Sequence, residues 1–387
     1  MANPLLPTDE RLVLSTGARD SAIADAPSSL ALLGNRVDKL LCKPHLLSYK
    51  KELVVTGGWH FSTDTMEALQ SMYSQMDLED AVDTEADEPM RSGDLTRARS
   101  QSSAAQKATP EKHDIEWSLA INLIKSILAK IEGLNSLEWE TDLPFFKDIW
   151  AVIPENIENL SINVFVPDPQ DRHEYAPHPE YFTKDDLTYL KNFKNLKRLR
   201  VYNMPESFQS VIWETVWKNA NLDTLELGMR YNPITRDPDN GNNPMPAIDH
   251  SWKYNPEREM AQKYRGYEGS GNLHHTHGYG EYLDGVAISK ARNVAMESMG
   301  LSMDDLKAMP LTTLRLDGFV VDDTSFAKYF DGLQKIVFTH KCVDAGLVLP
   351  KSLQGKTVIY KRESSVSELV VGSEIEVEAE VMGKASA

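Results

Sequence analysis

A short apolar phrase recurs along this chain and constrains its fold more than any other feature. Leu134-Asn-Ser-Leu-Glu-Trp139 reads L-x-x-L-x-W, and the same spacing of large apolar residues returns five more times. The further copies begin with Ile157, Leu196, Leu222, Leu311 and Leu333. Helical patterns accompany these copies, so helix, turn and strand are expected to alternate through most of residues 115–360.

The spacing of the phrase predicts one short strand per copy. Positions four and six face a core, positions three, five and seven face away, and position one closes the core from the preceding turn. One such strand cannot bury its apolar side alone, so the copies must stack into a parallel sheet. The shorter intervals match the roughly 20–29-residue period of leucine-rich repeats, and the longer ones imply insertions.

We therefore predict an α/β fold, an irregular leucine-rich-repeat solenoid with a curved parallel sheet and helices on the outer face. Degraded copies around Leu53 and Val358 bring the expected sheet to about seven or eight strands. Apolar stripes from Trp117 to Ile131, Phe145 to Ile153 and Phe208 to Val216 predict returning helices. Ser302 and Asp323 are expected to begin two more.

Composition separates ordered from disordered parts. Asp77 to Glu88 carries seven carboxylates and no basic residue, and the polar stretch after it has few large apolar side chains. Residues 76–112 are therefore expected to form a disordered insertion. Residues 1–35 lack sustained periodicity and should be disordered or loosely packed, and 363–387 should be an acidic disordered tail. The repeat domain would span 36–362, with an ordered elaboration at 229–300.

Charge limits the classes of partner. The 387 residues include 58 Asp and Glu against 41 Lys and Arg, a net charge of −17. This balance argues against nucleic acid or an anionic membrane as partner, and no window approaches the ~20 apolar residues of a membrane helix. The first residues lack a signal-peptide pattern, and Cys42 and Cys342 form no disulfide framework. We expect an intracellular protein, in the cytoplasm or nucleus.

Four phrases carry a resemblance to a known family. They are Leu134-Asn-Ser-Leu-Glu-Trp-Glu140, Tyr264-Arg-Gly-Tyr-Glu-Gly269, His277-Gly-Tyr-Gly-Glu-Tyr-Leu-Asp-Gly285 and Leu314-Arg-Leu-Asp-Gly-Phe-Val-Val321. Over residues 36–360 the chain resembles fungal leucine-rich-repeat proteins of the F-box-like type. The resemblance implies a protein-binding scaffold, and by analogy a substrate-recognition subunit of a ubiquitin ligase. No F-box is recognisable here, because Thr16 to Ser29 is too rich in small and polar residues.

Few residues suit catalysis or metal binding. His274, His275 and His277 lie in a glycine-rich stretch and are weak candidates for zinc ligands; the alternative is a polar loop. No nucleophile, base and acid can be placed together. We predict no catalytic residues, no metal and no cofactor. The alternative hypothesis is an enzyme whose 229–300 loop covers a polar cleft and whose three histidines hold a metal.

The open face of the predicted sheet is the remaining candidate site. Its outward positions include Ser136, Asn159, Ser161, Thr224, Gly228 and Thr313 as well as the residues predicted to bind a partner. The predicted binding residues are Arg198, Arg200 and Tyr202 at the centre, with Glu138, Glu140, Asn163, Glu226, Arg315 and Asp317 around them. Because Arg and Tyr are frequent in binding hot spots, we predict a protein partner. A basic spot on a strongly negative protein favours a partner with an acidic or phosphorylated segment. The alternatives are a merely solvated face, or one covered by an acidic stretch of this chain.

Overall fold

One ten-stranded sheet runs through the part of the chain that the computed structural model describes. The described residues are 10–17, 28–61, 112–164, 182–204, 208–230, 233, 245–256, 281–302, 304–362 and 379–381. The strands are β1 (Arg11–Ser15), β2 (Glu52–Gly57), β3 (Ser136–Thr141), β4 (Asn159–Asn163), β5 (Arg198–Met204), β6 (Thr224–Met229), β8 (Thr313–Asp317), β10 (Lys335–Thr339), β12 (Val358–Arg362) and β13 (Ala379–Val381). They lie side by side in chain order.

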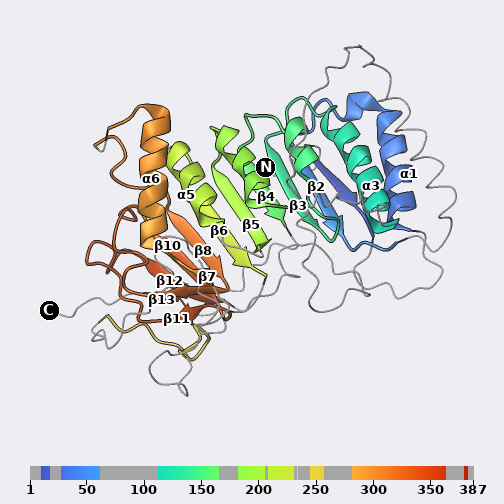
Figure 1. Cartoon of the computed structure of the whole chain (residues 1–387). Coiled ribbons are helices and arrows are strands. Elements are labelled where there is room, and N and C mark those ends of the chain that lie inside the picture. The colour runs from blue at the N-terminus through green and yellow to red at the C-terminus, as the bar shows by residue number, and fades with distance from the viewer. Residues whose placement is uncertain are drawn as a thin grey trace, which may run out of the picture.

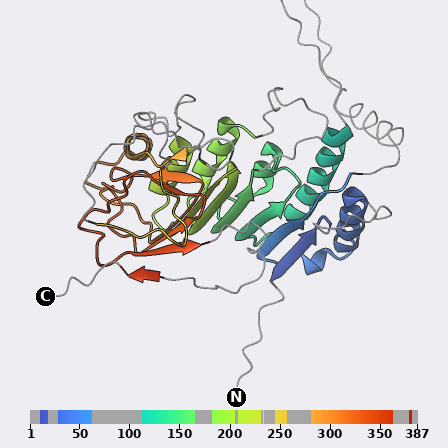
Figure 2. The same ribbon diagram turned by 90° about the horizontal axis from the view of Figure 1, so that it is seen from below.

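The first nine strands of this sheet are parallel, and β13 pairs antiparallel with β12. Seen from below, the strands form one continuous layer with the helices on one side (Figure 2). The predicted α/β fold with a large parallel sheet is confirmed. The sheet has one parallel strand more than expected, because Arg11–Ser15 adds β1 in register with β2.

The apolar phrase builds the core in the predicted register. Its first, fourth and sixth positions are all buried in the six clear copies, from Leu134, Leu137 and Trp139 to Leu333, Ile336 and Phe338. Leu199 and Leu225 are register partners on β5 and β6, and both are fully buried. Each strand therefore extends one apolar layer that no strand could bury alone.

A repeated backbone contact joins successive strands just before they begin. The carbonyl of Lys197, at position two of its copy, accepts hydrogen bonds from the amides of Asp223 and Thr224, at 2.9 and 3.2 Å. The carbonyls of Glu10, Lys51, Asn135, Glu158, Asp223 and Thr312 accept two amides in the same way. This contact fixes where each new strand begins relative to the one before it.

Helices cover the apolar side of the sheet (Figure 1). They are α1 (Ser29–Leu41), α3 (Lys112–Leu128), α4 (Lys184–Leu187), α5 (Gln209–Lys218) and α6 (Gly285–Met299), with the 3-10 helices η1 (Pro44–Leu46), η2 (Lys147–Val152) and η3 (Thr188–Asn192). The Asp284 side chain accepts the amide of Val286 at the start of α6, at 2.7 Å. Gly300 ends α6 with a φ of 67°, a conformation that glycine adopts without strain.

Two of the predicted helices are absent. At Ser302 and Asp323 the chain forms turns. The Asp322 carboxylate accepts the amides of Thr324 and Ser325, at 2.8 and 3.1 Å, which closes a turn in place of a helix start. Tyr329 has a φ of 71°, outside the helical region. Short polar caps begin turns as readily as helices, so the prediction was wrong at these sites. The stripe at Phe145–Ile153 forms the 3-10 helix η2.

The N-terminal residues differ from the expected loose packing where they are described. β1 belongs to the main sheet, and Leu14 and Leu33 are fully or almost fully buried. The five residues of β1 alternate too briefly to reveal a period. Of the predicted 76–112 insertion, only Lys112 is described, and it begins α3. Of the predicted tail at 363–387, the described residues are those of β13; the rest lies outside the described residues.

Part of the 229–300 elaboration packs against the main sheet. A second, parallel sheet has the order β11 (Val343–Asp344), β9 (Phe319–Val321) and β7 (Glu281–Tyr282). Trp252 is 6% exposed and its indole Nε1 donates to the Asp344 carboxylate at 2.8 Å. Trp252 therefore packs against the protein core. Residues 231–232, 234–244 and 257–280 lie outside the described residues.

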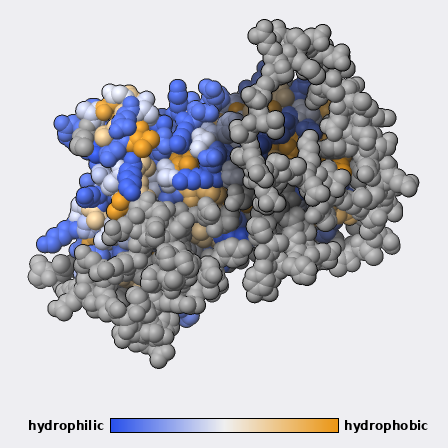
Figure 3. Space-filling model, viewed as in Figure 1, coloured by the Kyte–Doolittle hydropathy of each residue, from blue (hydrophilic) through white to orange (hydrophobic). Residues whose placement is uncertain are grey.

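Over α5 and α6 the visible outer surface is mostly hydrophilic, with apolar spots over α6 (Figure 3). The exposed apolar residues there are Val286, Val294 and Met299, with Leu301 just beyond the helix. Among the helices of the described ranges, none has the length and hydropathy that a membrane span requires.

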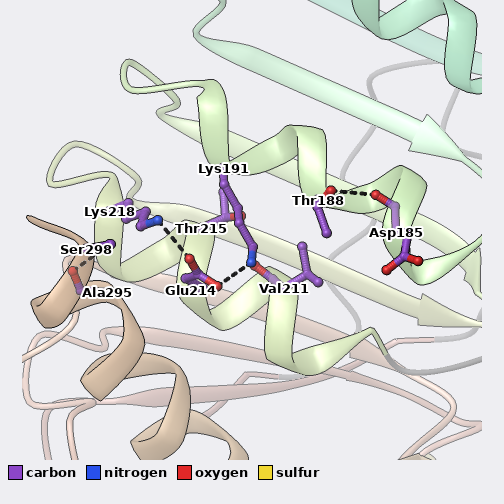
Figure 4. A network of polar contacts seen from close by, with 9 residues as sticks. All are labelled: Asp185, Thr188, Lys191, Val211, Glu214, Thr215, Lys218, Ala295 and Ser298. Carbon is purple, nitrogen blue, oxygen red and sulfur yellow. Dashed lines mark hydrogen bonds and ion pairs between the residues drawn. The ribbon is translucent and has the colours of Figure 1, made fainter.

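A buried carboxylate on α5 pairs with two lysines and joins α5 to η3 (Figure 4). The Glu214 carboxylate on α5 lies 2.5 Å from Lys191 Nζ on η3 and 2.7 Å from Lys218 Nζ on its own helix. Its side chain is 7% exposed. Burial alone would raise the pKa of Glu214, but the hydrogen bonds from both lysines outweigh it, so the pKa lies below its usual value. The charged form of Glu214 therefore stabilises the fold.

Substitution of a core leucine should be costly. Leu199→Ala and Leu225→Ala should each lower the free energy of unfolding by about 2–5 kcal/mol, through lost burial and the cavity left behind. Leu301→Ala is the matched control, because Leu301 is 40% exposed and such surface changes usually stay within about 0.5 kcal/mol. Urea denaturation measures all three, and equal costs for the three variants would contradict the assigned register.

Substitution of Glu214 should give a pH-dependent loss of stability. At pH 7, Glu214→Gln should lower the free energy of unfolding by about 1–3 kcal/mol, since hydrogen bonds from both lysines to a charged acceptor are weakened. A lowered pKa means that this contribution is complete above the unfolded-state value near 4.5 and is lost as the pH falls further. The difference from wild type should therefore shrink in acid.

The exposed pair between Glu158 and Lys197, whose side chains are 35% and 52% exposed, provides the control for Glu214. Glu158→Gln should cost less than about 1 kcal/mol. Urea titrations at several pH values compare the two variants. A Glu214→Gln defect that stayed constant from pH 7 into the acid range would show that the ion pair is not its cause.

Candidate binding face of the sheet

The predicted binding residues all lie on one face of the main sheet. Strand alternation directs positions three, five and seven of each copy away from the buried leucines and the helix layer. β5 carries Arg198, Arg200 and Tyr202, β3 carries Glu138 and Glu140, β4 ends with Asn163, β6 carries Glu226, and β8 carries Arg315 and Asp317. We call this surface the open face.

Four of these residues form a cluster around Glu226. Arg200 Nε lies 3.0 Å from Glu226 Oε1, and Arg315 Nη1 lies 3.7 Å from Oε2. The Tyr202 hydroxyl also donates to Glu226. All three charged side chains are less than one fifth exposed. Burial alone would lower the pKa of Arg200, but Glu226 raises it, so the guanidinium stays charged.

Tyr202 lies over a glycine of the neighbouring strand. A Cβ atom on Gly228 would lie 2.9 Å from Tyr202 Cδ1, so only glycine leaves room for the ring. Burial and the neighbouring Glu226 raise the pKa of the Tyr202 hydroxyl well above its usual value, and it remains protonated. Arg200 and Tyr202 are therefore held by the protein itself, whereas the sequence predicted side chains that are free to meet a partner.

Arg198 differs from the other residues of the open face. Its side chain is exposed at the beginning of β5, and within the described chain it has neither a hydrogen bond nor an ion pair. The Asn163 side chain, in contrast, accepts a hydrogen bond from the side-chain Nδ2 of Asn203 at 2.9 Å. Asp317 accepts one from the hydroxyl of Thr339 at 2.8 Å. Of the three central residues, Arg198 offers an available charge.

A groove of about 440 Å³ crosses the open face where β1 to β5 begin. Short polar side chains form its floor between charged walls. Its lining residues are Glu10, Arg11, Lys51, Glu52, Asn135, Ser136, Leu137, Glu138, Asn159, Leu160, Ser161, Arg198 and Arg200. Ser161 is 3% exposed, and its hydroxyl has no hydrogen-bond partner within the residues described. The volume is in the range of small ligand sites, about 300–1,000 Å³.

One wall of the groove was missed by the sequence reasoning. Arg11 on β1 lies 3.4 Å from both Glu52 on β2 and Glu138 on β3. Lys51 pairs with Glu10 at 2.7 Å. Burial raises the pKa of Glu52, Arg11 lowers it, and Glu138 raises it again, so the pKa stays above its usual value. Arg11 begins β1, a strand of five residues that is too short for the sequence to reveal its period.

The metal candidates fall outside this site. His274, His275 and His277 lie outside the described residues, and the described ones contain no group of three or more potential ligands that could hold a metal ion. Cys342 is fully buried, with its Sγ 3.1 Å from the Leu316 carbonyl oxygen. Burial raises the pKa of its thiol to about 11, which leaves it in the unreactive protonated form.

Fold and site together define an α/β protein with nine parallel strands, a helix layer on one face and a charged groove on the other. Comparison of the chain with protein-family models, with curated proteins and with solved structures found no match.

The two glutamates at position five of their copies should differ in their effect on stability. Glu226→Ala leaves Arg200 and Arg315 poorly compensated and should lower the free energy of unfolding by about 3–5 kcal/mol. Glu138→Ala removes a contact to Arg11, which is 49% exposed, and should cost less than about 1 kcal/mol. Chemical denaturation compares the two variants, and equal costs would contradict the buried character of the Glu226 cluster.

Proposed function

We propose that this chain is a leucine-rich-repeat solenoid that acts as a non-catalytic protein-recognition scaffold. The proposal is supported by the period of the apolar phrase, by the parallel strands in chain order, and by the position-two carbonyls that join each copy to the next. Solenoids of this kind present an extended sheet face to their partners. The open face is the recognition surface.

A single observation carries the choice of this face. Arg198 is exposed and uncompensated among the described residues of a face whose other charges mostly pair with one another. It also lines the groove. In a chain of net charge −17, a basic spot of this kind attracts an acidic or phosphorylated segment and orients it. Arg is frequent in binding hot spots because its planar guanidinium binds carboxylates and phosphates with two hydrogen bonds.

The alternative is a face covered by an acidic stretch of this chain. The described part of the tail, β13, pairs with β12 and not with β5. The run from Asp77 to Glu88 and the other residues of the tail lie outside the described residues.

Affinity capture tests this function. The full chain and its Arg198→Ala variant are used to capture proteins from an extract of the source organism, and bound proteins are identified by mass spectrometry. The affinity of each captured partner is then measured with purified proteins. We expect Arg198→Ala to weaken a genuine partner by at least about tenfold, because the main available charge of the groove is lost.

Lys197→Ala is the matched control, since it removes one positive charge from the neighbouring residue, whose ammonium pairs with Glu158. Its partner affinity should stay close to wild type. A captured partner that binds wild type and Arg198→Ala equally would show that the open face is not the recognition surface. If a Skp-type adaptor is captured and binds Lys197→Ala as tightly as wild type, the scaffold would be assigned to a ubiquitin ligase.

A further inference from the structure

The floor of the groove contains unused hydrogen-bonding groups. Ser136 on β3 and Asn159 and Ser161 on β4 lie between the charged side chains of β2–β3 and of β5. The Ser161 hydroxyl is buried without a partner among the described residues. A buried hydroxyl without a partner destabilises the free protein, so a ligand group that accepts its hydrogen bond would be favoured there.

The wall on β5 carries excess positive charge. Arg198 and Arg200 are register partners of Asn159 and Ser161. Arg200 shares the carboxylate of Glu226 with Arg315, so one negative charge faces two positive ones in that cluster. Arg198 adds a further positive charge at the rim. An anion above Asn159 and Ser161 would therefore meet two neutral donors and a guanidinium.

The opposite wall carries excess negative charge. Arg11 is shared between Glu52 and Glu138, so one positive charge faces two carboxylates on this wall. Glu138 also interacts electrostatically with Arg200 on the other wall. Lys51 and Glu10 neutralise each other at the groove's end. The raised pKa of Glu52 reflects burial and its repulsion from Glu138, against the attraction of Arg11. A basic group above this wall would relieve that repulsion.

We propose that the groove binds an extended peptide segment with an acidic group over Asn159, Ser161 and Arg198 and a basic side chain over Glu52 and Glu138. The proposal rests on the protein-recognition function and specifies the chemistry of the partner. The acidic group is a carboxylate or a phosphate. A ligand with only the acidic group or only the basic group would leave the excess charge of the other wall unpaired.

The sheet geometry also gives the spacing of these two groups. β3 and β5 are separated by β4, so their outward side chains lie about 9.5 Å apart, which is two strand spacings. In a segment with the polyproline II conformation, which has about three residues per turn and rises about 3.1 Å per residue, side chains three positions apart point the same way and lie about 9.3 Å apart. The segment crosses the strands and carries its acidic and basic residues three positions apart.

Fluorescence anisotropy with labelled synthetic peptides tests the proposal on the full chain. The peptides have uncharged Ala, Ser and Gln backgrounds. They carry one Glu and one Lys, either three positions apart in both orders or adjacent, or two Glu three positions apart. We expect one order of the three-position peptide to bind at least about tenfold more tightly than the adjacent pair. Replacement of its Glu by phosphoserine shows whether the groove prefers a phosphate or a carboxylate. Replacement of the same Glu by Gln should abolish the preference, because the negative charge is lost.

Two variants separate the groove from general effects on the fold. Ser161→Ala removes the unpaired hydroxyl and should weaken the preferred peptide about tenfold while the unfolding free energy stays equal to wild type or rises. Glu138→Lys reverses one wall and should transfer the preference to peptides with two acidic residues. Glu155→Lys, at an exposed position outside the groove lining, makes the same charge change and should leave the preference unchanged.

Specific results would overturn the proposal. They are equal affinity for all peptides, no binding of any peptide, unchanged affinity in Ser161→Ala, or the same reversal in Glu155→Lys. If these occur while Arg198→Ala still weakens a captured partner, the recognition function stands and the dipolar groove does not. If Arg198→Ala also leaves the captured partner's affinity unchanged, both fail together.

Discussion

The structure depends on one repeated backbone interaction, the carbonyl at position two that accepts two amides from the following copy. It holds each strand in register with the strand before it. A slip by one residue would turn Leu199 and Leu225 to solvent and bring their polar neighbours into the core. The same contact that protects the core therefore also aligns the outward positions into rows, and those rows form the groove and the Glu226 cluster.

The alignment of equivalent positions brings charged side chains on neighbouring strands close together, and the sheet places opposite charges side by side there. Side chains at position five of neighbouring copies lie about 4.8 Å apart, so like charges there would repel. Arg200, Glu226 and Arg315 alternate in sign and pair with one another. Where the alternation stops, at Ser161, the floor is neutral and its hydroxyl is left unpaired. The interruption of the pattern, rather than the pattern itself, leaves room and charge for a ligand.

The fold was more predictable than the site. Leucine spacing is a local signal, since each phrase specifies its own strand and inward face, and the burial of Leu134, Leu199 and Leu314 follows from it. The state of Arg200 and Tyr202 depends on Glu226, which lies 26 and 24 residues further along the chain. The register of the copies contained this information, because position five of each copy meets position five of the next. β1 was missed because five alternating residues define no period, and Ser302 and Asp323 because turns use the same caps as helices.

The last strand of the sheet has a consequence for the ends of the array. A stack of parallel units has a leading and a trailing edge that complement each other, so identical chains could continue the stack head to tail without limit. In this chain β13 runs against β12 and occupies the trailing edge with backbone of opposite direction. A second copy could not add its β1 there without first displacing that strand. One short reversal of direction thus ends the translational symmetry and opposes the growth of a filament.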